Sequence, residues 1–309
     1  MREFLESVSK LAVLVFVVTC MITAGLGLSV RNVIAPLRRA RLVLFALLAN
    51  FVVAPGLAYG LTELIPIDRS YATGLLLLGG AAGAPFLPKL AELARGDIAF
   101  SVGLMLLLMV GSVLFMPVVL PLLIPGLSAD PWPLLRPLLL TMLLPLGIGM
   151  IVRSRSEGWS AKLRPVFALV SNISMILAVL LLIGLNFSAM LGTFGSGAVA
   201  VGVVFIALST AVGCILGGPT AGTRSVLGLG TGQRNIAAAL LIATQNFASD
   251  PGVVVMLLVS TFAGLVPLLF AAQYFARRSS QAPTPGTSDS QSAELVSARA
   301  GVTQEEQNR

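Results

Sequence analysis

Histidine is absent from this chain of 309 residues, and charged residues make up only 11% of it. Without histidine, the chain lacks the side chain that most often shuttles protons near neutral pH and most often ligates metals. Soluble domains carry about 25% charged residues, so the low charge content excludes an ordinary soluble domain. Because 56% of the residues are hydrophobic, the composition indicates a protein that is integral to a lipid bilayer.

The two cysteines, Cys20 and Cys214, both lie inside apolar runs. We interpret them as small hydrophobic residues, so neither a disulfide nor a metal site is predicted. The sequence contains no Ser/His/Asp set, no cluster of metal ligands and no paired carboxylates deep in an apolar run, so we expect neither an enzyme nor a cofactor. The net charge of +7 does not indicate nucleic-acid binding, because the basic residues fall in short clusters between apolar runs.

Nine apolar segments are long enough to cross a bilayer. They cover residues 11–30, 41–61, 70–92, 98–124, 132–152, 163–185, 197–216, 222–247 and 252–275. We therefore predict an all-α polytopic membrane protein with nine transmembrane helices, in one transporter domain over residues 1–278. Residues 279–309 are rich in Ser, Pro, Gln and Thr, which predicts a disordered cytoplasmic tail.

Basic residues collect in the odd-numbered connections between these segments. The two richest clusters, around the first and fifth connections, are Arg31, Arg38, Arg39 and Arg41, and Arg153, Arg155, Lys162 and Arg164. Because cytoplasmic loops carry an excess of Lys and Arg, we expect the N-terminus outside and the C-terminus in the cytoplasm. The prediction is a multi-pass protein of the cell (inner) membrane.

The odd number of spans predicts an inverted repeat, with halves at about 11–124 and 163–275. In each half the third span is interrupted, by glycines and prolines at 79–89 and by polar residues around Arg234. Matched interruptions in two oppositely oriented halves point to the substrate site of a secondary transporter. The alternative, that the glycines only allow close helix packing, stays open at this point.

Arg234 is the most informative residue of the second interruption. Counting from about Gly222, it lies roughly 18 Å into its span at 1.5 Å per residue. That depth is close to the centre of a hydrocarbon layer about 30 Å thick, so the guanidinium should face a polar cavity rather than lipid. We expect Thr231, Gln233 and Asn235 to line this cavity or to cap a half-helix.

Three segments carry a resemblance to a known family. Residues 50–55 read Asn-Phe-Val-Val-Ala-Pro, residues 94–102 read Ala-Arg-Gly-Asp-Ile-Ala-Phe-Ser-Val, and Gly232 and Asn235 match the last Gly and Asn of Glu-x-Gly-x-Gln-Asn. Over nearly all of its membrane region the chain resembles the bile acid:sodium symporter family. The resemblance implies a panel domain and a core domain, two discontinuous helices that cross in the core, an organic anion bound near that crossing and two sodium ions behind it.

The chain departs from the family at the sodium ligands. Gly230 stands where the family has a ligating glutamate and Arg234 where it has a ligating glutamine, while Asn50 keeps an amide that is one methylene shorter. The family's Ser-Asn pair falls on Leu87 and Pro88. Because sodium needs oxygen ligands, we do not expect it at either family site.

We hypothesise that Arg234, with Lys89 as a second candidate, replaces the sodium ions. The expected substrate-binding residues are Arg234, Asn235, Gln233, Thr231, Lys89, Asn50 and Pro88. Two alternatives stay open: Lys89 could snorkel to the cytoplasmic surface, and Arg234 could be a structural charge paired only with carbonyls.

The sequence therefore predicts a secondary transporter that moves a small organic anion by alternating access without sodium. Protons are a candidate coupling ion, with Lys89 as the candidate carrier. The alternatives are a sodium-coupled symporter with altered ligands and a sensor that keeps the fold without moving substrate.

Overall fold

The structure is a computed structural model that describes residues 2–28, 39–124, 127, 130–193 and 195–281. Every regular element among these residues is a helix. The elements are α1 (Arg2–Gly27), α3 (Ala40–Leu48), η1 (Ala49–Val53), α4 (Ala54–Leu64), α5 (Arg69–Gly80), α6 (Leu87–Leu93), α7 (Ile98–Leu123), α8 (Trp132–Leu138), η2 (Leu139–Leu143), α9 (Leu144–Arg155), α10 (Glu157–Thr193), α11 (Ala198–Leu216), α12 (Ala221–Gly232), α13 (Ile236–Asn246) and α14 (Pro251–Gln281). The tail predicted to be disordered lies outside the described residues from residue 282 onward.

The all-α polytopic fold is confirmed. Within the described residues, eight helical segments are long and apolar enough to cross a membrane. The span expected at 70–92 is not among them, because it is divided into α5 and α6, which are both short. The exact count of nine crossings therefore stays a prediction.

Two spans contain a π-helical turn in place of a simple α-helix. The turn η1 joins α3 to α4, and η2 joins α8 to α9. Each turn stands just before a proline, Pro55 or Pro145, whose ring would clash with a carbonyl of the preceding α-helical turn. The wider turn accommodates the proline without ending the helix. The turn η1 also carries Asn50, which is fully buried in the core.

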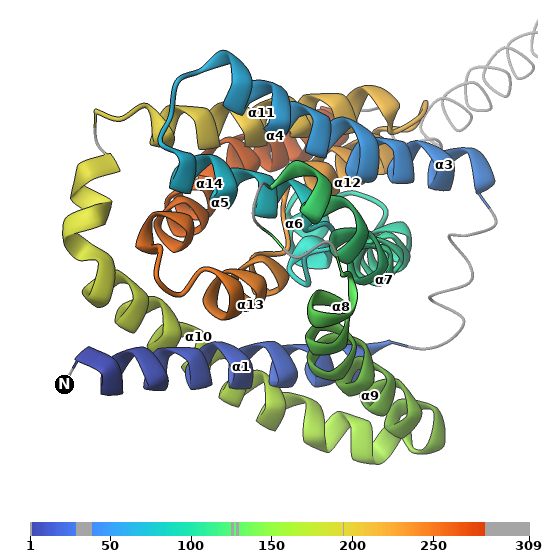
Figure 1. The fold of residues 1–309 in the computed structure, drawn as a ribbon. Helices are drawn as coiled ribbons and strands as arrows, with labels where there is room; N and C mark the ends of the chain where they lie inside the picture. Colours follow the sequence, from blue (N-terminus) through green and yellow to red (C-terminus); the bar gives the residue numbers. More distant parts are fainter. Residues whose placement is uncertain (1, 29–38, 125–126, 128–129, 194, 282–309) are drawn as a thin grey trace, which may run out of the picture.

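The helices form two groups, which we call the panel and the core (Figure 1). The panel consists of α1, α8–α9 and α10, with α1 packed along both α9 and α10. The contact between α1 and α9 depends on two glycines: a Cβ atom on Gly25 would lie 2.2 Å from the Leu146 carbonyl oxygen, and one on Gly149 would lie 2.6 Å from that of Ile22. The remaining helices make up the core.

Two interrupted helices cross inside the core. The first is interrupted between α5 and α6, and the second between α12 and α13. The backbone N–H of Asn235 donates a hydrogen bond of 2.8 Å to the Ala81 carbonyl, which joins one break to the other. The first half of each interrupted helix packs against the second half of the other one: α5 packs against α13, and α12 packs against α6. The two interruptions predicted from the sequence therefore meet in space.

Candidate functional site

Arg234 places its guanidinium in the crossing, and the residue is only 5% exposed. Its Nε donates to the Leu78 carbonyl at 3.1 Å, and its Nη2 donates to the Gly79 carbonyl. Its Nη1 donates to the Thr231 carbonyl at 3.2 Å and to Asn50 Oδ1 at 2.9 Å. No described carboxylate lies within salt-bridge distance of it. Neutral oxygens therefore surround this buried charge.

These carbonyls belong to the C-terminal ends of two half-helices. Leu78 and Gly79 lie in the last turn of α5, and Thr231 lies in the last turn of α12. The last carbonyls of a helix have no intrahelical partner, and the helix dipole makes this end negative. A positive group placed between two such ends is therefore favoured by both of them. The cation and the two helix ends stabilise one another.

Asn50 connects the guanidinium to the rest of the crossing. Its Oδ1 accepts from Arg234, while its Nδ2 donates to the Ala46 carbonyl at 3.0 Å and to Thr231 Oγ1 at 3.2 Å. The Thr231 hydroxyl in turn donates to the Leu227 carbonyl at 2.8 Å. The amide thus bridges η1 and α12 with both of its polar atoms in use. Three of the expected residues, Asn50, Thr231 and Arg234, are brought together here.

Asn235 begins the second half-helix. Its Oδ1 accepts from the Ala238 N–H at 3.2 Å, which is the N-cap geometry expected at the start of a helix. Its Nδ2 donates to the Gly83 carbonyl at 3.2 Å across the crossing. Since Asn235 is fully buried, its amide serves the junction of the two breaks. The sequence interpretation that polar residues at the break cap a half-helix holds for this residue.

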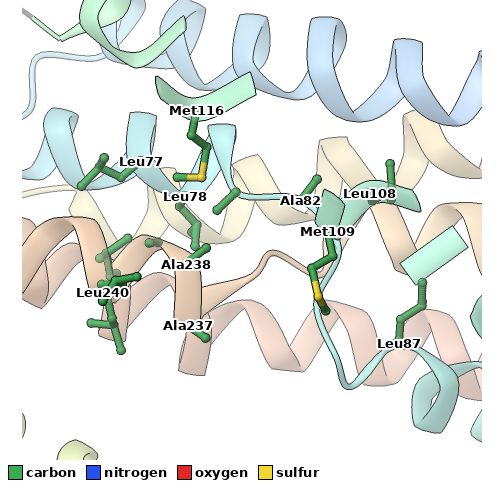
Figure 2. Close-up of a cluster of buried hydrophobic side chains, with 14 of the residues drawn as sticks. Leu77, Leu78, Ala82, Leu87, Leu108, Met109, Met116, Ala237, Ala238 and Leu240 are labelled. Carbon is green, nitrogen blue, oxygen red and sulfur yellow. The ribbon is translucent and has the colours of Figure 1, made fainter. Parts of the chain in front are cut away.

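A second part of the crossing is apolar. A Cβ atom on Gly230 would lie 3.0 Å from Leu87 Cδ2 and 3.2 Å from Leu104 Cδ2. Figure 2 shows Leu87, Leu108 and Met109 among the buried side chains gathered at the first break. Leu87 and Leu104 therefore occupy the space beside Gly230, where the family resemblance places carboxylate, amide and hydroxyl ligands.

Lys89 does not join Arg234, and the expectation that it shares the crossing is wrong. Its Nζ lies 2.7 Å from Glu92 Oε2, one turn along α6, and its side chain is 67% exposed. Pro88 stands in the first turn of this helix, where its missing N–H leaves no hydrogen bond unmade. Lys89 therefore faces away from the crossing.

Gln233 lies in the second break, between α12 and α13. Its backbone N–H donates to the Leu229 carbonyl at 2.8 Å and so closes the last turn of α12. Its side-chain Oε1 is buried and has no hydrogen-bond partner among the described residues. Buried polar atoms are nearly always hydrogen-bonded, so this amide is the best placed of the expected residues to meet a ligand or water.

Sequence reasoning missed Ser112. Its hydroxyl accepts from the Ala82 N–H at 2.7 Å and donates to the Ala82 carbonyl at 3.0 Å, so it satisfies both backbone groups of a residue in the first break. It is fully buried on α7. A polar residue near the middle of an otherwise apolar span was the only signal, and such residues also serve ordinary helix packing.

A cavity of about 270 Å³ opens where the panel meets the core. Panel residues on one side include Lys10 and Asn186, and core residues on the other include Thr244 and Asp250. It lies at the far end of α13 from Arg234. The boundary between the two domains is therefore open at this end, while the crossing itself is enclosed.

Comparisons with known proteins agree with this architecture. The model of the Sodium Bile acid symporter family matches residues 13–193. A probable sodium/metabolite cotransporter from Arabidopsis thaliana, the chloroplastic protein BASS3, is 25% identical over 240 residues, which cover 75% of this chain and 56% of the relative. The uncharacterized sodium-dependent transporter YocS from Bacillus subtilis (strain 168) is 26% identical over 246 residues, which cover 76% of this chain and 74% of the relative.

The chain thus spans little more than half of the length of the Arabidopsis relative. The family match, however, covers more than half of this chain and includes α5, α6 and α7. It favours a transporter over an enzyme. The chain belongs to the sodium bile acid symporter family and is a multi-pass membrane protein.

Proposed function

We propose that this protein moves a small organic anion across the membrane by alternating access, and that it does so without sodium. In this proposal Arg234 takes the place of a sodium ion at the crossing. The substrate binds between panel and core, and the two domains move relative to each other around it. The protein lies in the cell membrane with its N-terminus outside, and residues 11–124 and 163–275 form the two inverted repeats.

The hydrogen bonds of Arg234 carry this proposal. A sodium ion between two half-helices would be held by carbonyl and side-chain amide oxygens. The guanidinium receives the same kinds of oxygen, from Leu78, Gly79, Thr231 and Asn50. A sodium ion entering this space would also be repelled by the fixed charge, by about 4 kcal/mol at 4 Å with an effective dielectric constant of 20.

The apolar side of the crossing, beside Gly230, also supports transport without sodium. Leu87 and Leu104 lie against Gly230, and alkyl groups cannot coordinate an alkali ion. No sodium ligand set is therefore expected there.

The sign of the buried charge supports an anionic substrate. Arg234 has no described carboxylate partner, so no formal negative charge is paired with it. Such a cation favours negative charge on a substrate that binds near it. The nearest expected contact for the substrate is Gln233, whose Oε1 is buried without a partner among the described residues.

Uptake into proteoliposomes tests the proposal. A panel of labelled organic anions is offered to purified protein with either sodium or choline as the only external cation. We expect at least one anion to enter at the same rate in both media. Strict dependence on sodium would refute the proposal and favour a symporter with altered ligands, whereas binding without flux would favour a sensor.

A pair of variants tests whether sodium-free uptake depends on Arg234. Arg234→Gln restores the amide of the family motif, and we expect sodium-free uptake to fall at least tenfold because the two helix ends lose their cation. Arg69→Gln is the matched control, since Arg69 is exposed at the opposite end of α5. If both variants transport like the parent protein in choline, the guanidinium does not replace sodium.

A further inference from the structure

A groove with two arginines at its edge lies near the start of α12, at the opposite end of this helix from the crossing. It is formed where α3 begins and α11 ends, has a volume of about 530 Å³, and is lined by Arg41, Leu42, Phe45, Ile215, Leu216 and Arg224, with the turn at Gly218 and Pro219. We call it the α3–α11 groove. The start of α3 contacts this turn, since a Cβ atom on Gly218 would lie 3.0 Å from Leu42 Cδ2.

Both arginines keep hydrogen-bonding capacity for a ligand. Arg41 lies over the Phe45 ring, with Cζ 5.5 Å from its centroid, and Arg224 donates from Nε and Nη2 to the Gly218 carbonyl at 3.4 and 3.3 Å. Neither forms a salt bridge with a described acid. The guanidinium group has five N–H donors, so each side chain has donors to spare.

Positive charge also predominates next to the groove. An adjoining cavity shares Leu42 and Pro219 with it and is lined by Arg39, Arg95 and Asp97. The carboxylate of Asp97 is already paired with Arg39 at 3.0 Å. The potential in this region therefore favours a ligand that carries negative charge.

Most of the remaining lining of the groove is apolar, and one of these residues, Ile215, is 79% exposed. Phe45 and Ile215 lie on helical segments that are long and apolar enough to span the membrane. Hydrocarbon is the solvent that suits such side chains. A ligand that fills the groove needs an anionic end and a hydrocarbon end.

We propose that the α3–α11 groove binds an anionic phospholipid, with the phosphate between Arg41 and Arg224 and an acyl chain along Phe45 and Ile215. Basic pockets between transmembrane helices at the cytoplasmic side suit such headgroups. A free phosphate would satisfy the arginines but would leave the apolar wall unused. The lipid would hold the start of α3 against the turn that precedes α12.

Native mass spectrometry of the purified full chain tests this site. Phosphatidylglycerol and phosphatidylcholine with identical acyl chains are titrated onto delipidated protein. We expect phosphatidylglycerol to bind at least tenfold more tightly, and the double variant Arg41→Gln, Arg224→Gln to lose this preference. The control, Arg155→Gln with Lys162→Gln, removes the same charge from exposed positions on the panel and should keep it.

Two results would overturn the proposal. One is equal binding of the two lipids to the parent protein, a measurement that does not depend on any variant folding. The other is displacement of phosphatidylglycerol by sn-glycerol-1-phosphate at a similar concentration, which would mean that the arginines bind a free anion. Thermal unfolding of the double variant in phosphatidylcholine controls for damage to the fold.

Discussion

At the scale of single residues, the crossing shows how a charge can be buried without a countercharge. An isolated ion is costly in a low-dielectric interior unless polar groups replace its hydration shell. Arg234 receives that replacement from backbone carbonyls in the last turns of α5 and α12. The two breaks would in turn be costly if nothing donated hydrogen bonds to the carbonyls at their helix ends. The arginine and the interruptions therefore depend on each other.

Replacing Lys89 tests whether this residue takes part in transport or in proton coupling. Its pair with Glu92 is largely exposed, with side-chain exposures of 67% and 64%, and exposed ion pairs contribute about 0–1 kcal/mol. We expect Lys89→Met to shift the melting temperature by no more than about 2 °C and to leave sodium-free uptake and its pH dependence unchanged. Loss of the pH dependence would instead make Lys89 the proton carrier.

The sequence could locate Arg234 but could not orient Lys89. The depth of Arg234 in its span follows from counting residues, and a charge near the middle of the bilayer must face a polar interior rather than lipid. Lys89 lies close to the end of a short helix, α6, where a long side chain can reach either inward or outward. Its direction depends on the helical phase in which α6 restarts after the break.

At the scale of elements, the first break depends on a glycine. Gly83 has φ +79°, and a Cβ atom there would lie 2.2 Å from the Met109 backbone nitrogen on α7. The left-handed conformation and the close backbone contact both exclude other residues. The chain can leave α5 and pass beside α7 only because this position lacks a side chain.

Gly83→Ala should therefore destabilise the protein. We expect a loss of more than about 2 kcal/mol, because strained backbone alone costs on the order of 1–3 kcal/mol. The melting temperature of the purified protein measures it. Gly56→Ala is the control, since Gly56 lies in α4 with nothing within 4 Å of an added Cβ and should be neutral or stabilised by up to about 1 kcal/mol. Equal melting temperatures for both variants would contradict the role given to Gly83.

The positions of the breaks were predictable, but their internal geometry was not. Glycines, prolines and Arg234 mark both interruptions in the sequence. The cap formed by Asn235 and the contact of Ser112 with Ala82 depend on how elements distant in the chain pack. The start of one helix was also misplaced: α10 begins at Glu157 where 163 was expected, because hydropathy detects only the part of a helix that is strongly apolar. The expected end at 185 falls beside the kink at Asn186.

At the scale of the whole molecule, helices within the panel pack tightly, whereas the boundary between the panel and the core is partly open. The close approach of Gly25 to α9 fixes α1 within the panel, while a cavity separates part of the panel from the core. Alternating access in secondary transporters is largely a rigid-body movement of one bundle against another. The expected movement here is therefore at the panel–core boundary.

Pulsed electron–electron distance measurements can detect this movement in a background with Cys20→Ala and Cys214→Ala. One spin-label pair, at Ser7 and Ser249, crosses the boundary, and a control pair, at Leu11 and Leu180, lies within the panel; all four residues are exposed. We expect the first distance to shift, or to show two populations, when a transported anion is added, and the second to stay constant. A constant first distance in transporting protein would rule out the rigid-body description.

The covalent attachment of Arg234 has an energetic consequence. A dissolved ion that binds outside and leaves inside releases the free energy of its own gradient in every turnover. A guanidinium bonded to the polypeptide returns to its starting point with each turnover and releases none. If Arg234 replaces sodium as proposed and no proton is coupled, the carrier fills a vesicle only until the anion has the same electrochemical potential on both sides, and it runs backwards equally well once the gradient is reversed.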